Sequence, residues 1–323
     1  MKDKRIEPQG HCPVSERAAN GRFRRPRPLV TRRIMLTWDS IGKWGRRASD
    51  RPDAAVWGTA DSGHGAVASA APARDLVLEA AIAHEQVEVL FQPLVDAGSG
   101  RVAGAEALAR SPIVRSADAL FARAASSGLS ERLSRLVQRK ALRCAAAWEG
   151  PLRALKVSIN LLPADISRDG YERWLLEEIA AAGLDPARVT AEITESALLV
   201  DRDRAAERLS RLRELGVSVA IDDFGSGYAN LSYLTALPLD MLKIDKALIA
   251  GIEAGTRDRI VVEAIIRLAA ELDLSVVAEG VESDGQLALL RRWGCDLYQG
   301  FLGAGALSHE ALTEFVTAQT EAA

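Results

Sequence analysis

The sequence contains few of the residues that mark several classes of protein. Of its 323 residues only four are histidine and three are cysteine, and none of them stands in a metal-binding motif. Cys12, Cys144 and Cys295 do not pair by spacing, so the chain fits a reducing cytoplasm better than an oxidising compartment. No apolar run approaches the roughly 18 residues that a membrane-spanning helix needs. We therefore expect no membrane span. The formal net charge is -3, so DNA binding is not expected either.

The first part of the chain differs in composition from the rest. Six arginines crowd one short span beside two prolines: Arg22, Arg24, Arg25, Arg27, Arg32 and Arg33. We expect residues 1–73 to form a disordered basic arm, which either contacts anionic partners or simply stays solvated. The arm lacks the apolar stretch of a secretion signal, and Met35 could be the true start. Residues 74–320 are long enough for one barrel core of about 250 residues.

The most informative segment is a pair of adjacent carboxylates, Asp222 and Asp223, at the end of an apolar run. Neighbouring residues on a strand point to opposite faces, so burying both acids is costly unless both meet cations. At the very end of a strand both can turn toward one site, where they could bridge two divalent metals. The alternative is an Asp-rich turn that caps the next helix. This segment alone leaves both interpretations open.

Other apolar runs also end in polar residues, at regular intervals. Asn160 precedes Glu192 by 32 residues, and Glu192 precedes Asp222 by 30. One strand, one helix and two loops take roughly that length. In a (β/α)8 barrel such positions converge at the C-terminal face, where active sites form. The residues that we place there are Glu106, Asn160, Glu192, Asp222, Lys243, Asp245, Glu279, Glu282 and Gln299.

The segments between these runs show the three- and four-residue spacing of amphipathic helices. Residues 201–215, for example, place Ala205, Leu209 and Leu212 on one face, and Gly216 ends the helix. Asp273 stands at the stop position of another helix, where it would adopt a left-handed conformation. Further helices are predicted over residues 117–125, 131–148, 171–182, 260–272, 286–293 and 308–317.

Several of these segments match the motifs of one known family. Glu106-Ala107-Leu108 is the tripeptide that names that family, and Phe91-Gln92-Pro93-Leu94-Val95 is similar to its opening strand. The other matching segments are Asp222-Asp223-Phe224-Gly225-Ser226-Gly227-Tyr228, Lys243-Ile244-Asp245, Ala278-Glu279-Gly280-Val281-Glu282 and Gln299-Gly300. In this order and spacing, over about residues 76–315, the chain resembles the EAL-domain cyclic-di-GMP phosphodiesterases. The resemblance implies a TIM-like (β/α)8 barrel whose first strand runs antiparallel to the others.

The resemblance also implies metal ligands. One cation would be held by Glu106, Asn160, Glu192 and Asp222, and Asp222 would bridge to a second cation that Asp223 also binds. Such oxygen ligands suit Mg2+ or Mn2+ better than zinc, which favours histidine or cysteine. The resemblance thus implies two cations per active site.

The remaining polar residues receive roles by the same resemblance. Lys243 would orient the attacking water, and Glu279 would act as general base or as a water-mediated metal partner. Glu195 would anchor the loop after Asp223, and Glu282 would be a structural partner near its strand. The residues expected to bind substrate are Gln92, Arg110, Asp245 and Gln299.

The activity implied is hydrolysis of cyclic-di-GMP to linear 5′-pGpG. The segment from Arg110 to Arg115 is shorter than the loop usual in the family, so the rim of the substrate pocket differs. An alternative is therefore a non-catalytic receptor that binds cyclic-di-GMP or a protein partner. The complete set of metal ligands favours the enzyme.

The segment after Asp223 predicts a homodimer. In the family this segment packs near a two-fold interface. Tyr228, Leu231, Tyr233 and Leu234 place more apolar surface on it than a monomer usually exposes. The alternative is that these side chains pack onto the barrel.

Overall fold

Eight strands close into one barrel in the computed structural model, which describes residues 74–194, 202–226 and 231–321. The strands, in chain order and each paired with the next, are β1 Glu88–Asp96, β2 Val102–Arg110, β3 Lys156–Leu161, β4 Val189–Thr194, β5 Ser218–Phe224, β6 Met241–Ile244, β7 Ser275–Ala278 and β8 Leu297–Tyr298. β1 runs antiparallel to both of its neighbours, β2 and β8, whereas the other pairs are parallel. The predicted barrel with one reversed strand is therefore confirmed.

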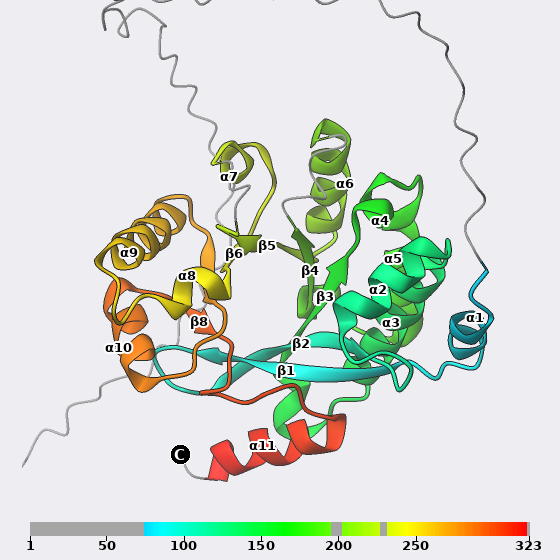
Figure 1. Ribbon diagram of the computed structural model, residues 1–323, viewed down its shortest axis with the longest axis horizontal. Helices are drawn as coiled ribbons and strands as arrows, with labels where there is room; N and C mark the ends of the chain where they lie inside the picture. Colours follow the sequence, from blue (N-terminus) through cyan, green and yellow to red (C-terminus); the bar gives the residue numbers. More distant parts are fainter. Residues whose placement is uncertain (1–73, 195–201, 227–230, 322–323) are drawn as a thin grey trace, which may run out of the picture. The chain divides into compact units, whose positions relative to one another are not determined.

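Helices surround these strands (Figure 1). Those before β4 are α1 Leu76–Ala83, α2 Ala117–Ser126, α3 Ser130–Ala146, α4 Pro163–Ser167 and α5 Tyr171–Ala182. Those after it are α6 Arg202–Glu214, α7 Ser232–Ala236, α8 Lys246–Ala250, α9 Thr256–Glu271, α10 Asp284–Trp293 and α11 His309–Glu321. Two short 3-10 helices, Gly150–Ala154 and Pro186–Arg188, precede β3 and β4. No described helix combines the length and the apolar character needed to cross a bilayer.

Helix ends follow the local chemistry that the sequence indicates. Gly183 and Gly294 end α5 and α10 in the left-handed conformation, with φ of 72° and 87°. Asp273, one residue beyond the cap of α9, has a φ of 57°, as predicted from its place in the sequence. α9 begins at Thr256, four residues before the predicted start, because its first turn is polar and the apolar spacing cannot reveal it.

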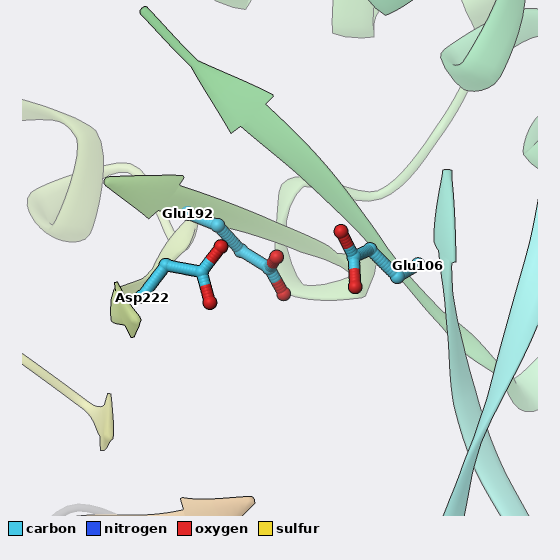
Figure 2. Close-up of side chains that lie close together, drawn as sticks. All are labelled: Glu106, Glu192 and Asp222. Atoms are coloured by element: carbon cyan, nitrogen blue, oxygen red, sulfur yellow. The ribbon is translucent and has the colours of Figure 1, made fainter. Parts of the chain in front are cut away.

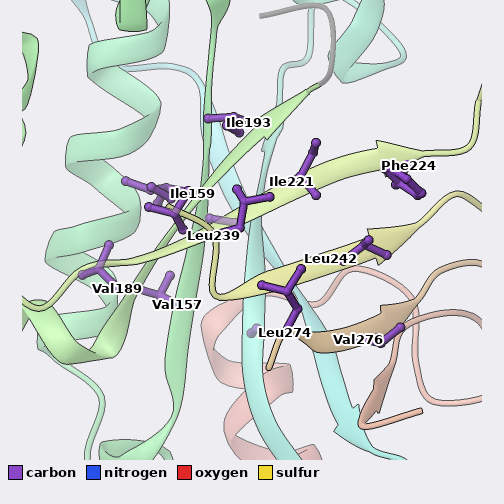
Figure 3. Close-up of a cluster of buried hydrophobic side chains, with 14 of the residues drawn as sticks. Val157, Ile159, Val189, Ile193, Ile221, Phe224, Leu239, Leu242, Leu274 and Val276 are labelled. Atoms are coloured by element: carbon purple, nitrogen blue, oxygen red, sulfur yellow. The ribbon is translucent and has the colours of Figure 1, made fainter. Parts of the chain in front are cut away.

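The strands bury both of their faces. Outward-pointing residues such as Val157, Ile159, Ile221, Leu242 and Val276 pack into the main hydrophobic core (Figure 3). A second cluster, formed by Leu94, Ala220, Met241 and Val277, contains residues of opposite parity, which point into the barrel. Each of the last three lies two residues before an ionisable residue: Asp222 on β5, Lys243 on β6 and Glu279 directly after β7. The barrel interior is thus apolar below a charged layer at the C-terminal ends of the strands.

The predicted apolar surface after Asp223 is only partly present. Tyr233 and Leu234 are 8% and 5% exposed because the short helix α7 turns both side chains into the main core. Placing them on a dimer surface was therefore wrong. Leu231 remains 57% exposed, while Tyr228 lies outside the described residues, as do the predicted arm of residues 1–73 and Glu195.

Candidate active site

One buried lysine stands at the centre of the charged layer. Lys243, on β6, is 1% exposed. Its Nζ lies 2.7 Å from Glu279 Oε1, 2.8 Å from Glu192 Oε2, 2.9 Å from Asp222 Oδ1 and 3.2 Å from Glu106 Oε2. Glu106, Glu192 and Asp222 lie within β2, β4 and β5, and Glu279 directly follows β7, so four strands direct their carboxylates at one ammonium group.

The carboxylates also lie close to one another. Glu106, Glu192 and Asp222 each offer an oxygen within 4.8 Å of those of the other two, and Figure 2 shows their side chains pointing toward a common centre. Asp222, Asp223 and Glu279 form a second group that meets the same limit. Asp222 belongs to both groups, which is the arrangement that a pair of cations with one bridging carboxylate requires.

Asp223 reaches the site because the strand is irregular there. The register between β5 and β6 shifts between Ile221 and Phe224, and Asp223 has a φ of 55° in the left-handed region. Aspartate tolerates this conformation better than most residues. Its backbone N–H donates to Asp222 Oδ1 at 3.0 Å. The irregular backbone thus brings two adjacent acids to one site, which regular alternation would separate.

Two amide side chains hydrogen-bond to Glu106, and a third contacts one of them. Asn160 Nδ2, on β3, donates to Glu106 Oε1 at 2.9 Å, and Gln299 Nε2 donates to Glu106 Oε2 at 2.9 Å. Gln299 Nε2 also lies 3.0 Å from Gln92 Oε1, and Gln92 Nε2 donates to the carbonyl of Ala304 at 3.2 Å. Glu106 therefore has a donor on each oxygen and cannot rotate without breaking one of these bonds.

The electrostatics of the site are strongly perturbed. Burial, reinforced by the charges of Glu106 and Asp222, raises the pKa of Glu192 well above its usual range. Burial raises the pKa of Glu279 to about 8, and burial together with Asp222 and Asp245 raises that of Asp223 to about 6. Burial alone would lower the pKa of Lys243, but the four surrounding carboxylates raise it instead. The site holds more negative charge than one lysine can neutralise.

The residues fit a divalent cation. Glu192 Oε1 and Gln299 Oε1 are buried without a hydrogen-bond partner among the described residues. A buried carboxylate oxygen without a donor is costly, and a cation would satisfy it. The donor set consists of carboxylate and amide oxygens, which hard cations such as Mg2+ and Mn2+ prefer.

A cavity of about 620 Å³ opens above these groups. Its charged floor includes Glu106, Asp222, Asp223, Lys243 and Glu279. One wall is apolar and is formed by residues of α2, α3 and the ends of β2 and β3, among them Leu108, Phe121, Val137, Ile159 and Leu162. A volume of this size falls in the range of small-molecule sites.

The structure does not bring every predicted site residue to this cavity. Arg110 lines a separate hollow with Ser111–Arg115, and its Nη1 donates to the carbonyl of Ala109 at 2.8 Å. Asp245 accepts from the backbone N–H of Ala247 at 2.8 Å and so caps α8. Glu282 lines the cavity with an exposed side chain.

Sequence reasoning missed two polar residues of α3 that also line the cavity, Ser134 and Gln138. Both are 2% exposed and lie one turn apart on the face that also carries Leu133, Val137 and Ala141. Two polar residues within the apolar stripe of a helix were a readable signal, because such residues need buried partners.

Comparison with known proteins gives consistent matches. The EAL domain family model matches residues 76–306. The cyclic di-GMP phosphodiesterase NbdA of Pseudomonas aeruginosa is 38% identical over 246 residues, which are 75% of this chain and 31% of NbdA. The chain spans about a third of the length of the first curated relatives it matches.

Solved structures agree with this comparison. The PaMucR phosphodiesterase in its c-di-GMP complex has a TM-score of 0.69 and 32% identity, covering 73% of this chain and 97% of that chain. Klebsiella pneumoniae BlrP1 in its manganese and cyclic-di-GMP complex has a TM-score of 0.63 and 33% identity, covering 69% of this chain and 56% of that chain.

Proposed function

The chain belongs to the EAL-domain family, and from this membership we propose that it is a metal-dependent phosphodiesterase that hydrolyses cyclic di-GMP to linear 5′-pGpG. The observation that carries the proposal is the group of four carboxylates around buried Lys243, at the C-terminal end of the barrel. The named activity of NbdA and the c-di-GMP complex of PaMucR support the choice of substrate. A cytoplasmic location stays a prediction from the cysteine content.

The two clusters of acids around Asp222 support a site for two Mg2+ or Mn2+ ions. One ion would be held by Glu106, Asn160, Glu192 and Asp222. Glu192 Oε1 is buried without a hydrogen-bond partner among the described residues, so it is available to bind this ion. Asp222 and Asp223 would hold the second. When bound, such ions neutralise charge on a phosphate and make a water molecule more acidic.

Lys243 would stabilise negative charge on the phosphate, and Glu279 would transfer a proton. The ammonium group of Lys243 is fixed by its four ion pairs, so it offers a preorganised positive charge where the phosphate becomes more negative. Glu279 has a pKa of about 8, which suits a group that accepts a proton from the attacking water near neutral pH. Its Oε1 is held by Lys243, and we assign proton transfer to this carboxylate.

The cavity provides for the rest of the substrate. Purine rings would lie against its apolar wall, and Gln92 and Gln299 would position the phosphodiester beside Glu106. Arg110 and Asp245 stay predicted substrate contacts. Arg110 would first have to leave the carbonyl of Ala109, and Asp245 would have to leave the backbone N–H of Ala247.

We keep the homodimer as part of the proposal, with a smaller contact than the sequence predicts. Leu231 is the exposed apolar residue described in the segment after Asp223. Leu231→Asp should give a folded monomer with weaker activity, whereas Tyr233→Asp would damage the core. Light scattering at micromolar concentration tests this, and a wild-type protein that is monomeric yet fully active would exclude it.

The proposed activity is tested by product analysis of purified protein with cyclic di-GMP and Mn2+ or Mg2+. We expect conversion to 5′-pGpG, loss of turnover in EDTA and recovery on adding metal. Glu106→Gln should lower turnover at least about 100-fold, whereas Glu177→Gln, an exposed acid on α5, should not change it. Tight binding without turnover by the wild-type protein with either metal would identify a receptor instead.

A further inference from the structure

A network of buried polar side chains contacts the backbone of Asn160, a proposed metal ligand. Asp165, on α4, is 0% exposed, and Ser134, Gln138 and Tyr171 are each 2% exposed. Ser134 Oγ donates to Asp165 Oδ2 at 2.6 Å, and Tyr171 Oη donates to Gln138 Oε1 at 2.9 Å. The network therefore joins three helices, α3, α4 and α5.

The same network forms hydrogen bonds to the backbone at the end of β3. Gln138 Nε2 donates to the backbone carbonyl of Asn160 at 2.9 Å and lies 3.0 Å from Ser134 Oγ. Two residues further on, the backbone N–H of Leu162 donates to Asp165 Oδ2 at 3.1 Å. The chain is thus held at residue 160 and again at residue 162, on either side of the strand end.

These hydrogen bonds to β3 matter because the side chain of Asn160 holds Glu106. The side chain of Asn160 donates to Glu106 Oε1 at 2.9 Å, so a shift of its backbone would move both groups. Residues that hold metal ligands through hydrogen bonds commonly change metal affinity by 10–100-fold. Asp165 has one cationic partner among the described residues, Arg168 at 3.3 Å, so its full burial depends on these hydrogen bonds.

We propose that Gln138, whose amide nitrogen is held by Ser134 and Asp165, is a positioning residue that fixes Asn160 and Glu106 in the geometry that binds the metal. This inference rests on the proposed function, since it takes Asn160 to be a metal ligand. Gln138 acts through the carbonyl of Asn160. Its loss is therefore expected to lower metal affinity in the folded protein.

The test measures Mn2+ binding to the full chain without substrate. Binding is monitored by electron paramagnetic resonance, in which the signal of the free ion decreases as Mn2+ binds. Gln138→Met keeps the shape of the side chain but removes the donor to Asn160, and we expect its dissociation constant for Mn2+ to rise about tenfold or more. Tyr171→Phe is the matched control. It removes a hydrogen bond at the far end of the network and leaves the bond to Asn160, so its affinity should stay within about twofold of wild type.

The outcomes separate this inference from the function on which it rests. A wild-type protein that binds no Mn2+ would overturn the proposed function and this inference with it. If the wild-type protein binds Mn2+ and Gln138→Met matches Tyr171→Phe in affinity, only the inference is overturned. Should Gln138→Met fail to fold, Ser134→Ala replaces it, with an expected loss of about threefold. An unchanged affinity in that variant would equally reject the positioning role.

Discussion

Replacing Lys243 with methionine should strongly destabilise the metal-free protein. Methionine has a similar length but carries no charge, so the change leaves the four carboxylates without their shared partner. Because Lys243 is 1% exposed, water cannot replace the lost ion pairs.

The expected size follows from the burial of the site. Removing one partner of a buried ion pair costs about 3–5 kcal/mol. For a domain of this size each kcal/mol lowers the melting temperature by about 2–4 °C. The variant should therefore melt about 6–20 °C below wild type in EDTA.

The loss should also depend on pH. The pKa of Glu279 is raised to about 8 by burial and neighbouring acids, and Lys243 opposes that rise. When folding raises the pKa of an acid, the protonated acid favours the folded state. This contribution to stability is complete at pH values below the pKa of the acid in the unfolded protein, and it is lost as the pH rises through its pKa in the folded protein. Since the variant lacks the opposing charge, its deficit should be larger at pH 8.5 than at pH 5.5.

Thermal unfolding in EDTA at these two pH values checks this expectation, with Lys246→Met as the matched control. Lys246 lines the same cavity but is exposed, so its loss should lower the melting temperature by no more than about 2 °C. Adding Mn2+ should narrow the gap between Lys243→Met and wild type, because the ion replaces the missing positive charge. A Lys243→Met variant as stable as Lys246→Met at pH 8.5 in EDTA would refute the electrostatic account of the site.

Three further predictions test other parts of the structure. Burial raises the pKa of the Cys295 thiol to about 12, so iodoacetamide at pH 8 should modify it only after denaturation, as read by peptide mass spectrometry. Hydrogen bonding from Arg123 lowers the pKa of Asp75 from 3.8 to about 2. In denaturant titrations, wild type should therefore be more stable than Asp75→Asn by its full margin at pH 7, and this margin should shrink as the pH falls toward 2. A Cβ added at Gly300 would lie 2.2 Å from the carbonyl oxygen of Val281. Gly300→Ala should therefore lower the free energy of unfolding, measured in urea, by about 3 kcal/mol, and a loss below about 1 kcal/mol would contradict this contact.

The sequence predicts much of this fold because the period of the barrel is visible in it. Glu106, Asn160, Glu192 and Asp222 stand at corresponding places in successive strands, and strand alternation then directs them inward. Apolar spacing between them locates the helices, and Gly183 and Asp273 mark where two of them end.

Other features depend on contacts that spacing cannot reveal. The pairing of Lys243 with four acids needs the closed barrel, which brings β2 and β4, neither of them a neighbour of β6, to the same lysine. Tyr233 and Leu234 form an apolar pair whose direction depends on the short helix α7. The side chain of Arg110 was expected at the phosphate, but the segment that follows it encloses a hollow of its own.

The most direct test of the account is anomalous diffraction at the manganese edge from crystals of the protein grown with Mn2+. We predict two peaks that share Asp222 as a ligand, one beside Glu106, Asn160 and Glu192 and the other beside Asp223. Crystals that contain manganese but show no peak within bonding distance of Asp222 would contradict the assignment of this site.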